Sequence, residues 1–256
     1  RVWLIQIKNN FVREAVYRSN FITGLITDIV WMGVELSLFS VIYANTESFA
    51  GWTKEQTFFF LGIFFGADAL FTTFFQTNFW RFTDLIHKGD LDILITKPIS
   101  PAFLALTRWM SLTNLFNFLF GIIILVRYAE PAGFAGGWLW LCVPLWLLFG
   151  MTMSLLLRFF TMVWVFWTER GWPLHRLYFG FFKFASIPDT AFPKALRYFL
   201  KTLLPFAFIG SVPARALLKG LEWNEYALVF GVFTVFFLVD RYLWIQGLKR
   251  YQSASS

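Results

Sequence analysis

The chain has 256 residues, of which 58% are hydrophobic and only 14% are charged, and its mean hydropathy is +0.61. Soluble domains usually carry about 25% charged residues, so this composition excludes an ordinary soluble domain and predicts an all-α, polytopic membrane protein with 1–256 as a single transmembrane domain. The formal net charge of +7 does not predict binding to nucleic acid, because Lys and Arg beside membrane helices are expected from the positive-inside rule and from contact with anionic lipid.

Residues 1–20 are predicted to form an interfacial helix. Leu4, Ile7, Phe11 and Ala15 recur at helical spacing, and basic residues occupy the other faces. A helix with one apolar face and basic flanks lies in the plane of the lipid headgroups. The alternative interpretation is an ordinary polar tail before the first span.

The first two membrane spans are predicted within residues 21–80, at about 21–43 and 57–80. A bilayer core requires about 20 residues of helix, which both segments supply. Gly62 and Gly66 in the second segment form a GxxxG pair, which permits close approach of another helix. Three carboxylates fall inside these spans: Asp28, Glu35 and Asp68.

The loop at 81–108 is the longest polar interruption in the first half of the chain. It contains a short amphipathic piece, a break at Gly89, a second short piece, and then Lys97-Pro98. A loop that folds into short helices between two spans is expected to bind a partner.

Three further spans are predicted within 109–187. The third covers about 109–126, and a glycine-rich turn at 128–137 follows it. Residues 138–167 are apolar except for Arg158, which predicts one long, tilted or kinked fourth helix. The fifth span, at about 172–187, is unusually basic.

Short broken helices are predicted for 188–220, before the sixth and last span at 226–246. Four prolines interrupt this segment, and prolines at that density break helices. Such backbone persists at membrane depth only where it packs on protein or lines a cavity. The prolines are Pro188, Pro193, Pro205 and Pro213.

The distribution of Lys and Arg predicts that both termini are cytoplasmic. With six spans and an inner N-terminus, the inner segments hold more Lys and Arg than the outer segments, as the positive-inside rule requires. The inner segments are 1–20, 81–108, 168–176 and 241–256, and the outer segments are 46–56, 127–137 and 188–220.

Six charged residues in or near the spans are candidates for a translocation path, because an unpaired charge at mid-bilayer costs about 2.5–3.5 kcal/mol on insertion scales. One interpretation is mutual pairing that fixes helix register, together with snorkelling of Arg176 and Lys183 from the two ends of a short helix. The other is that Arg158, Arg176 and Lys183 form a basic wall for an anionic substrate. The six candidates are Asp28, Glu35, Asp68, Arg158, Arg176 and Lys183.

No motif for catalysis or for metal binding was found in the sequence. No glycine precedes a lysine, so the chain lacks a phosphate-binding P-loop, and it also lacks HExxH and CxxC motifs. The chain is therefore expected not to be an enzyme and to bind no cofactor or metal. ATP hydrolysis, if it drives this protein, must occur on another chain.

Several motifs resemble those of the integral-membrane permease subunits of ABC-2 type ABC transporters, specifically a poorly characterised six-span branch. The resemblance covers nearly the whole chain in order. The motifs are Tyr17-Arg18-Ser19-Asn20-Phe21, Gly89-Asp90-Leu91-Asp92-Ile93-Leu94 with Lys97-Pro98-Ile99, Phe166-Trp167-Thr168-Glu169-Arg170, Leu204-Pro205-Phe206 with Pro213 and 217–220, and Arg250-Tyr251-Gln252-Ser253.

This resemblance implies a permease half of an ATP-driven exporter in a bacterial or archaeal plasma membrane. The partners it implies are a cytosolic ATP-binding cassette subunit, which binds ATP and Mg²⁺, a second permease subunit in a homo- or heterodimer, and membrane lipid. The substrate would be bulky or amphiphilic, such as a lipid, glycan, peptide or drug.

The resemblance also implies that 84–96 is the coupling helix that docks into the ATPase. Its apolar residues Leu85, Ile86, Leu91, Ile93 and Leu94 would enter a groove of the partner, inside a charged rim. The coupling residues are thus Asp84, Leu85, Lys88, Gly89, Asp90, Leu91, Asp92, Leu94 and Pro98.

Two other classes of protein remain open. A proton-coupled secondary transporter could use the acids within the spans, although 21–126 and 138–244 show no convincing inverted repeat. A membrane-bound enzyme or assembly factor is the third hypothesis.

Overall fold

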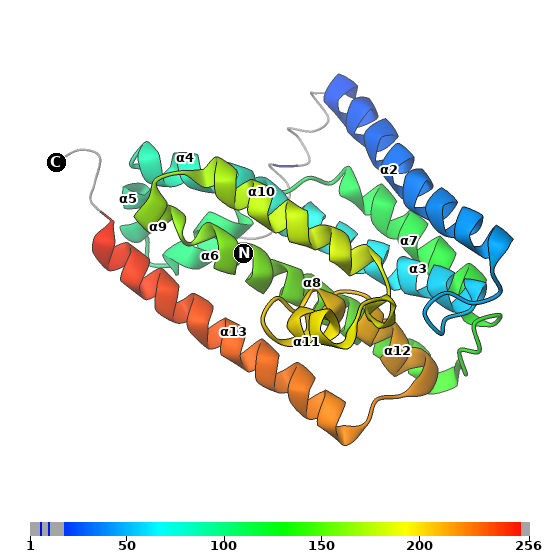
Figure 1. Ribbon diagram of the computed structural model, residues 1–256. Coiled ribbons are helices and arrows are strands. Elements are labelled where there is room, and N and C mark those ends of the chain that lie inside the picture. The colour runs from blue at the N-terminus through cyan, green and yellow to red at the C-terminus, as the bar shows by residue number, and fades with distance from the viewer. Residues whose placement is uncertain (1–5, 7–9, 11–17, 252–256) are drawn as a thin grey trace.

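Long, mostly apolar helices make up the bundle (Figure 1). The computed structural model describes Gln6, Asn10 and residues 18–251, with the backbone alone for 18–21. Within this described part there is no β-strand, and an isolated bridge joins Phe49 to Trp52. The interfacial helix predicted for 1–20 falls almost entirely outside the described residues.

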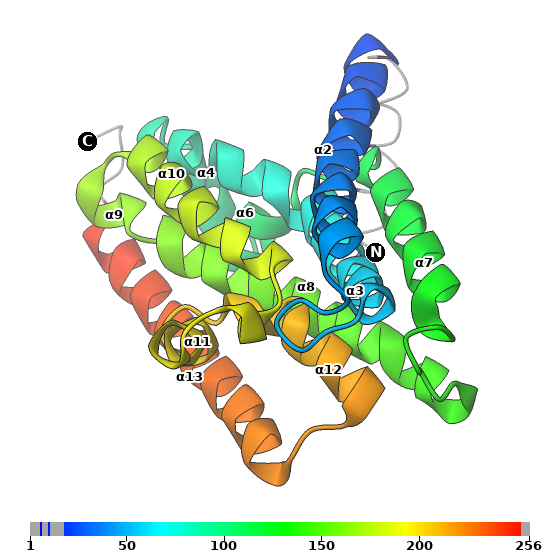
Figure 2. The ribbon, with the colours of Figure 1, turned by 45° about the vertical axis from the view of Figure 1, so that its right-hand side comes forward.

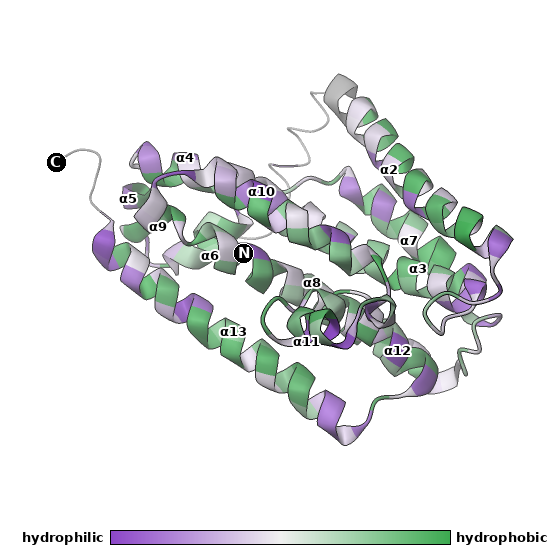
Figure 3. Cartoon of the chain, viewed as in Figure 1, coloured by the Kyte–Doolittle hydropathy of each residue, from purple (hydrophilic) through white to green (hydrophobic). Residues whose placement is uncertain are grey.

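Four helical stretches of the described chain are long and apolar enough to cross a membrane, judged by length and composition. They alternate with shorter helices, and Figure 3 shows that hydrophobic residues predominate along them. The helices α7 (Asn114–Ala129) and α10 (Gly171–Phe182) have 16 and 12 residues, fewer than the roughly 20 that a bilayer core requires. The structure therefore supports four of the six predicted spans by this measure: Ile22–Asn45, Lys54–His87, Gly137–Thr168 and Trp223–Arg250.

The second stretch is the centre of the fold. It consists of α3 (Lys54–Phe71), a π-helical turn η1 (Thr72–Gln76) and α4 (Thr77–His87). In its most apolar 18-residue window 72% of the residues are buried, against 11% for the first stretch. Thr53 begins α3 with a capping box, in which its hydroxyl accepts from the Gln56 amide.

Small residues hold α3 against α7. A Cβ added to Gly62 would lie 2.6 Å from the backbone nitrogen of Leu125, and one added to Gly121 would lie 2.9 Å from that of Gly66. The predicted GxxxG pair therefore does face another helix at backbone contact distance.

The helix α2 (Arg18–Asn45) lies at the periphery, and both views show it leaning away from the rest of the bundle (Figures 1 and 2). The last helix, α13 (Trp223–Arg250), packs along α8 and α9. In its most apolar window only 22% of the residues are buried. Much of the surface of α2 and α13 is therefore free for lipid or for another subunit.

Two boundaries differ from the sequence-based prediction. Residues 81–87, predicted as loop, continue the second span as α4, because Phe82 is buried and ties this turn to the core. The third helix begins at Asn114 and not at Trp109. The side chain of Asn78 bonds both the amide and the carbonyl of Trp109, at 2.8 and 2.7 Å, which holds this backbone out of the helix.

The predicted long, kinked fourth helix is confirmed. A short turn η2 (Gly137–Leu141) leads into α8 (Cys142–Met162), and after a break α9 (Val165–Thr168) continues the stretch. Glu169, with φ of 55°, ends it. The fifth span appears as α10 and a turn η3 (Lys183–Ser186).

Residues 188–220 form short helices, as predicted. They are η4 (Asp189–Ala191), α11 (Lys194–Thr202), η5 (Phe206–Phe208) and α12 (Ser211–Lys219). Together with the start of α13 they form what we call the α11 end of the molecule, which lies in front of α8 in Figure 1.

The opposite end carries α5 (Asp90–Ile95) and α6 (Pro101–Thr107), beside α4, α9 and the last turn of α13 (Figures 1 and 2). A hydrophobic cluster of its own holds this α5 end together, separate from the main core around α3. It is built from Phe79, Phe82, Leu91, Leu94, Leu104, Phe159, Met162, Phe166 and Trp244, among others.

Candidate functional site

Three consecutive helices, α4, α5 and α6, fold back on one another at the α5 end, and we call this unit the hairpin. Gly89 has φ of 74°, a left-handed conformation that glycine adopts without strain, and it turns the chain from α4 into α5. Asp90 and Asp92 lie in the first turn of α5, where the helix dipole favours carboxylates. Ser100 caps α6, and Pro101 is its first residue.

The apolar face predicted for partner binding is partly wrong. Leu91 and Leu94 are 0% and 1% exposed. Because they are three residues apart, they lie on the same face of α5, and both pack into the chain's own hydrophobic cluster. Leu85 and Ile86 are also packed against that cluster. Ile93 remains exposed, and so does Ile95, which sequence reasoning missed although it lies two residues further along the same short helix.

The charged residues of this hairpin remain at the surface. Asp84 and Lys88 form an ion pair of 3.0 Å, with side chains 64% and 66% exposed. Asp90 and Pro98 are exposed, and Asp92 is half-buried. The charged side chains predicted for the rim are therefore at the surface, and their role in docking stays a prediction.

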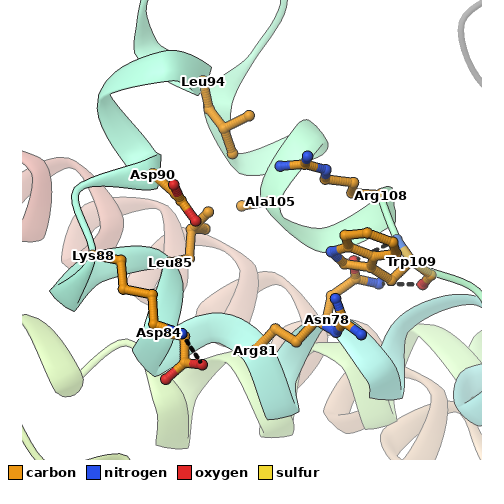
Figure 4. Close-up of a pocket in the computed structure, with 10 residues that line it drawn as sticks. All are labelled: Asn78, Arg81, Asp84, Leu85, Lys88, Asp90, Leu94, Ala105, Arg108 and Trp109. Atoms are coloured by element: carbon orange, nitrogen blue, oxygen red, sulfur yellow. Dashed lines mark hydrogen bonds and ion pairs between the residues drawn. The ribbon is translucent and has the colours of Figure 1, made fainter.

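A cleft of about 380 Å³ opens between α4, α5 and α6 (Figure 4). Trp109 lines this cleft, and two guanidinium groups lie close to its indole ring. Arg81 is 4.1 Å and Arg108 is 5.2 Å from the ring centroid. Asp84, Lys88 and Asp90 from the hairpin also line this cleft.

The C-terminal end of α13 ties α5 to the bundle. Burial raises the pKa of Tyr251 above its usual value, and the nearby carboxylates of Asp92 and Asp90 raise it further. The Tyr251 ring also lies 6.4 Å from that of Phe166 in α9. The end of α13 therefore lies close to both α5 and α9.

The acids of the first span have separate polar partners. Asp28 accepts a hydrogen bond of 2.7 Å from the amide of Asn117 in α7. Glu35 accepts one of 3.2 Å from the Ser186 hydroxyl in η3. No ion pair to either acid was found among the described residues. The predicted mutual pairing of the charges within the spans is therefore not observed.

Asp68 and Lys183 line one cavity of about 320 Å³, which we call the α10 cavity. It lies between α2, the junction of α3 with η1, and α10. Two of the six candidate charges thus meet in one hollow.

Arg158 is fully buried and does not face this cavity directly. Its Nη2 hydrogen-bonds with Nδ1 of His175, and its guanidinium lies 4.5 Å from the centre of the Tyr178 ring. The rings of Trp80 and Phe179 also surround it, at 5.7 and 4.9 Å. Cation–π contacts therefore take the place of a carboxylate partner.

The predicted basic wall is wrong as an arrangement. Arg176 is exposed on α10, while His175 and Tyr178 of the same helix are buried beside Arg158. Arg158, from α8, therefore packs against one face of α10, whereas Arg176 lies on another face of that helix. Of the three basic residues, only Lys183 lines the α10 cavity.

Sequence reasoning missed two further sets of charged residues. Asp240 in α13 is 3% exposed, and neither carboxylate oxygen has a hydrogen-bond partner in the described chain. Its position in the sixth span was the available signal.

At the α11 end, Asp189 is buried among Ser211, Lys201 and Arg215. Because these residues come from broken helices with no regular spacing, their meeting had no signal in the sequence.

No group of three or more His, Cys, Asp or Glu side chains suited to a metal ion occurs within the described residues. The charged side chains described above instead form contacts between helices or line cavities.

Long apolar helices around buried charged side chains are typical of membrane transport proteins. Residues 29–255 match the family described as ABC-2 family transporter protein, and the chain belongs to this family. It is therefore a multi-pass membrane protein and a permease of an ABC-type transporter, and this membership implies association with an ATP-binding cassette subunit. No curated protein and no solved structure matches the chain.

Proposed function

We propose that this chain is the membrane half of an exporter driven by ATP, which a separate cytosolic subunit hydrolyses with its own Mg²⁺. The observation that carries the proposal is the hairpin at the α5 end. Its buried leucines fix α5 on the bundle, while Ile93 and Ile95 project from it, 58% and 45% exposed, beside the exposed carboxylate of Asp90. Exposed apolar residues inside a charged rim are typical of a docking surface.

The contacts of α5 also support a transmission role. Leu91 and Leu94 pack in one cluster with Phe166 and Trp244, so α5 shares its core with α9 and α13. A partner that moved α5 on binding or hydrolysing ATP would thereby move two of the long apolar helices.

This proposal includes an orientation and an assembly. The α5 end and both termini would be cytoplasmic, in a plasma membrane, because the inner segments predicted from Lys and Arg include 81–108 and 241–256. The exposed sides of α2 and α13 would be available to lipid and to a second permease subunit, either identical or paralogous. The cargo would be bulky or amphiphilic.

The test is capture of the ATPase in mild detergent. Tagged wild-type protein is compared with a variant that carries Ile93→Glu and Ile95→Glu, which changes only exposed side chains of α5. Leu203→Glu is the matched control, since Leu203 is 65% exposed at the α11 end. We expect wild type and control to retain an ATP-binding subunit at about equal stoichiometry and the double variant to lose it.

If wild-type protein captures no ATPase, the proposal fails. The second candidate, a proton-coupled transporter that uses Asp28 and Asp68, would then account for the carboxylates within the first two long helices. In that case transport in vesicles should follow a proton gradient and ignore ATP.

A further inference from the structure

The α10 cavity contains several polar groups that lack partners. Tyr178 is 1% exposed, lines the cavity, and has no hydrogen-bond partner for its hydroxyl within the described structure. The side-chain oxygen of Gln76, which lines the cavity from η1, is also buried without a partner within the described structure. A buried polar group without a hydrogen bond costs about 1–3 kcal/mol, so a cavity lined by two of them is suited to a ligand that satisfies both.

The two charged residues of the cavity also lack ion-pair partners. Among the described residues, neither Asp68 nor Lys183 takes part in an ion pair. Asp68 comes from α3 and Lys183 from η3, so the opposite charges enter the cavity from different elements.

The remaining wall is aromatic and apolar. Trp31 from α2 and Phe71, Phe179 and Phe182 line it. Trp31 is 51% exposed, and it marks the side where the cavity meets the lipid-facing surface of α2. The opposite boundary is the π-helical turn η1, which supplies Gln76; such turns occur frequently at functional sites.

The shape and lining limit the ligand. A volume of about 320 Å³ is at the lower end of small-molecule sites, so it accommodates a headgroup or a ring but not a large molecule. A carboxylate with aromatic rings is suited to an ammonium group, and Lys183 with the Tyr178 hydroxyl is suited to an acidic group. An attached alkyl chain would pass Trp31 toward lipid.

We infer that the α10 cavity binds the headgroup of a zwitterionic amphiphile, with its ammonium at Asp68 and its acidic group at Lys183. That this ligand is the transported cargo rests on the proposed function; its binding to the isolated permease does not. The site differs from the anionic-substrate wall predicted from sequence, because the acid contributes as much as the lysine.

Binding can be measured on the full chain in a non-ionic maltoside detergent. The probes are an alkyl betaine, an alkyltrimethylammonium and an alkyl carboxylate, all with the same brominated chain. Bromine near the cavity mouth quenches indole fluorescence, and Trp31→Phe shows how much of the quenching arises there. For wild type we expect the betaine to bind at least about tenfold more tightly than either singly charged probe, because only it satisfies both charges.

Two variants separate a ligand site from a merely structural one. Asp68→Asn should weaken the betaine and the ammonium probe by about tenfold and leave the carboxylate probe unchanged. Lys183→Met should weaken the betaine and the carboxylate probe and leave the ammonium probe unchanged. Asp240→Asn, at an acid outside the cavity, and Lys194→Met, at a second exposed lysine, are the controls and should bind all three probes as wild type does.

The apparent affinity of each probe is compared between variants in the same detergent. Partition of the probe into the micelle is equal in these samples and cancels from the ratio. Equal binding of the three probes to wild type, or an equal loss of all three in Asp68→Asn and Lys183→Met, would overturn the inference. Competition by phosphatidylcholine would identify the occupant as a bilayer lipid, whereas its failure to compete would indicate a separate amphiphilic cargo. Loss of ATPase capture would not affect any of these results, so the two proposals can fail independently.

Discussion

Charged side chains at the α11 end are paired, whereas those around the α10 cavity are not. At the α11 end the carboxylate of Asp189 is fully buried and receives Lys201 at 3.1 Å and Arg215 at 3.4 Å, and both cations also reach Glu225. In the α10 cavity, Asp68 and Lys183 face the same hollow without an ion pair between them.

Burial of a charge without a partner is costly, so this difference separates two uses of charge in one bundle. The network around Asp189 holds short, proline-interrupted helices together, where few backbone hydrogen bonds cross between elements. Asp68 and Lys183 form no such network among the described residues, which agrees with the ligand site that we infer for the α10 cavity.

The largest expected effect is at Asp189. Asp189→Ala leaves Lys201 and Arg215 facing each other without the central carboxylate, and removal of one partner from a buried network costs about 3–5 kcal/mol. We expect a correspondingly large fall in the free energy of unfolding, measured by denaturant titration in detergent. Asp68→Ala, which removes an acid without an ion pair, should cost much less; equal losses would erase the distinction between the two regions.

The contact between α3 and α7 gives the next largest effect. Gly62→Ala would place a methyl group 2.6 Å from the Leu125 backbone, and overpacking of this kind costs about 1–3 kcal/mol. Gly231→Ala in α13, where no atom lies within 4 Å of the added Cβ, is the control and should be neutral or slightly stabilising. The measurement is the midpoint of thermal unfolding; a shift of equal size in both variants would show that the close packing contributes nothing.

Much of the fold could be predicted from the sequence. The apolar runs and the GxxxG pair predicted long helices and the approach of α3 to a neighbour, because hydropathy and small residues act locally. The prolines likewise predicted the short helices of 188–220. The same apolar runs did not show that α3 is central and α2 peripheral, since lipid and protein interior favour the same residues.

The site was predicted less completely, for a related reason. The position of the hairpin formed by α4, α5 and α6 follows from its polar residues and Gly89, and its docking to an ATPase stays a prediction. The inward direction of Leu91 and Leu94 depended on Phe166 and Trp244, which are distant in sequence. Glu35 meets Ser186 151 residues away, and no periodicity within either element indicates such a contact.

A smaller effect is expected from pH at the α11 end. Burial by itself would raise the pKa of Asp189, but Arg215, Lys201 and the Ser211 hydroxyl outweigh it and hold the pKa below its usual value. A carboxyl with a depressed folded-state pKa stabilises the fold above its unfolded pKa of about 3.9. This stabilisation is lost as pH falls through the folded-state pKa. Unfolding midpoints recorded between neutral and acidic pH should therefore fall less steeply in Asp189→Asn than in wild type.

The smallest effect is expected at the exposed ion pair of the hairpin formed by α4, α5 and α6. Asp84 and Lys88 are 3.0 Å apart and largely solvated, and exposed pairs at this spacing contribute about 0.3–0.5 kcal/mol. Asp84→Asn should therefore leave the unfolding midpoint nearly unchanged. Its effect on ATPase capture is a separate matter: if the charged rim orients the partner, salt should weaken capture by wild type more than capture by the variant. A destabilisation as large as that of Asp189→Ala would mean that the pair is structural, and the α5 end would then resemble the α11 end in its use of charge.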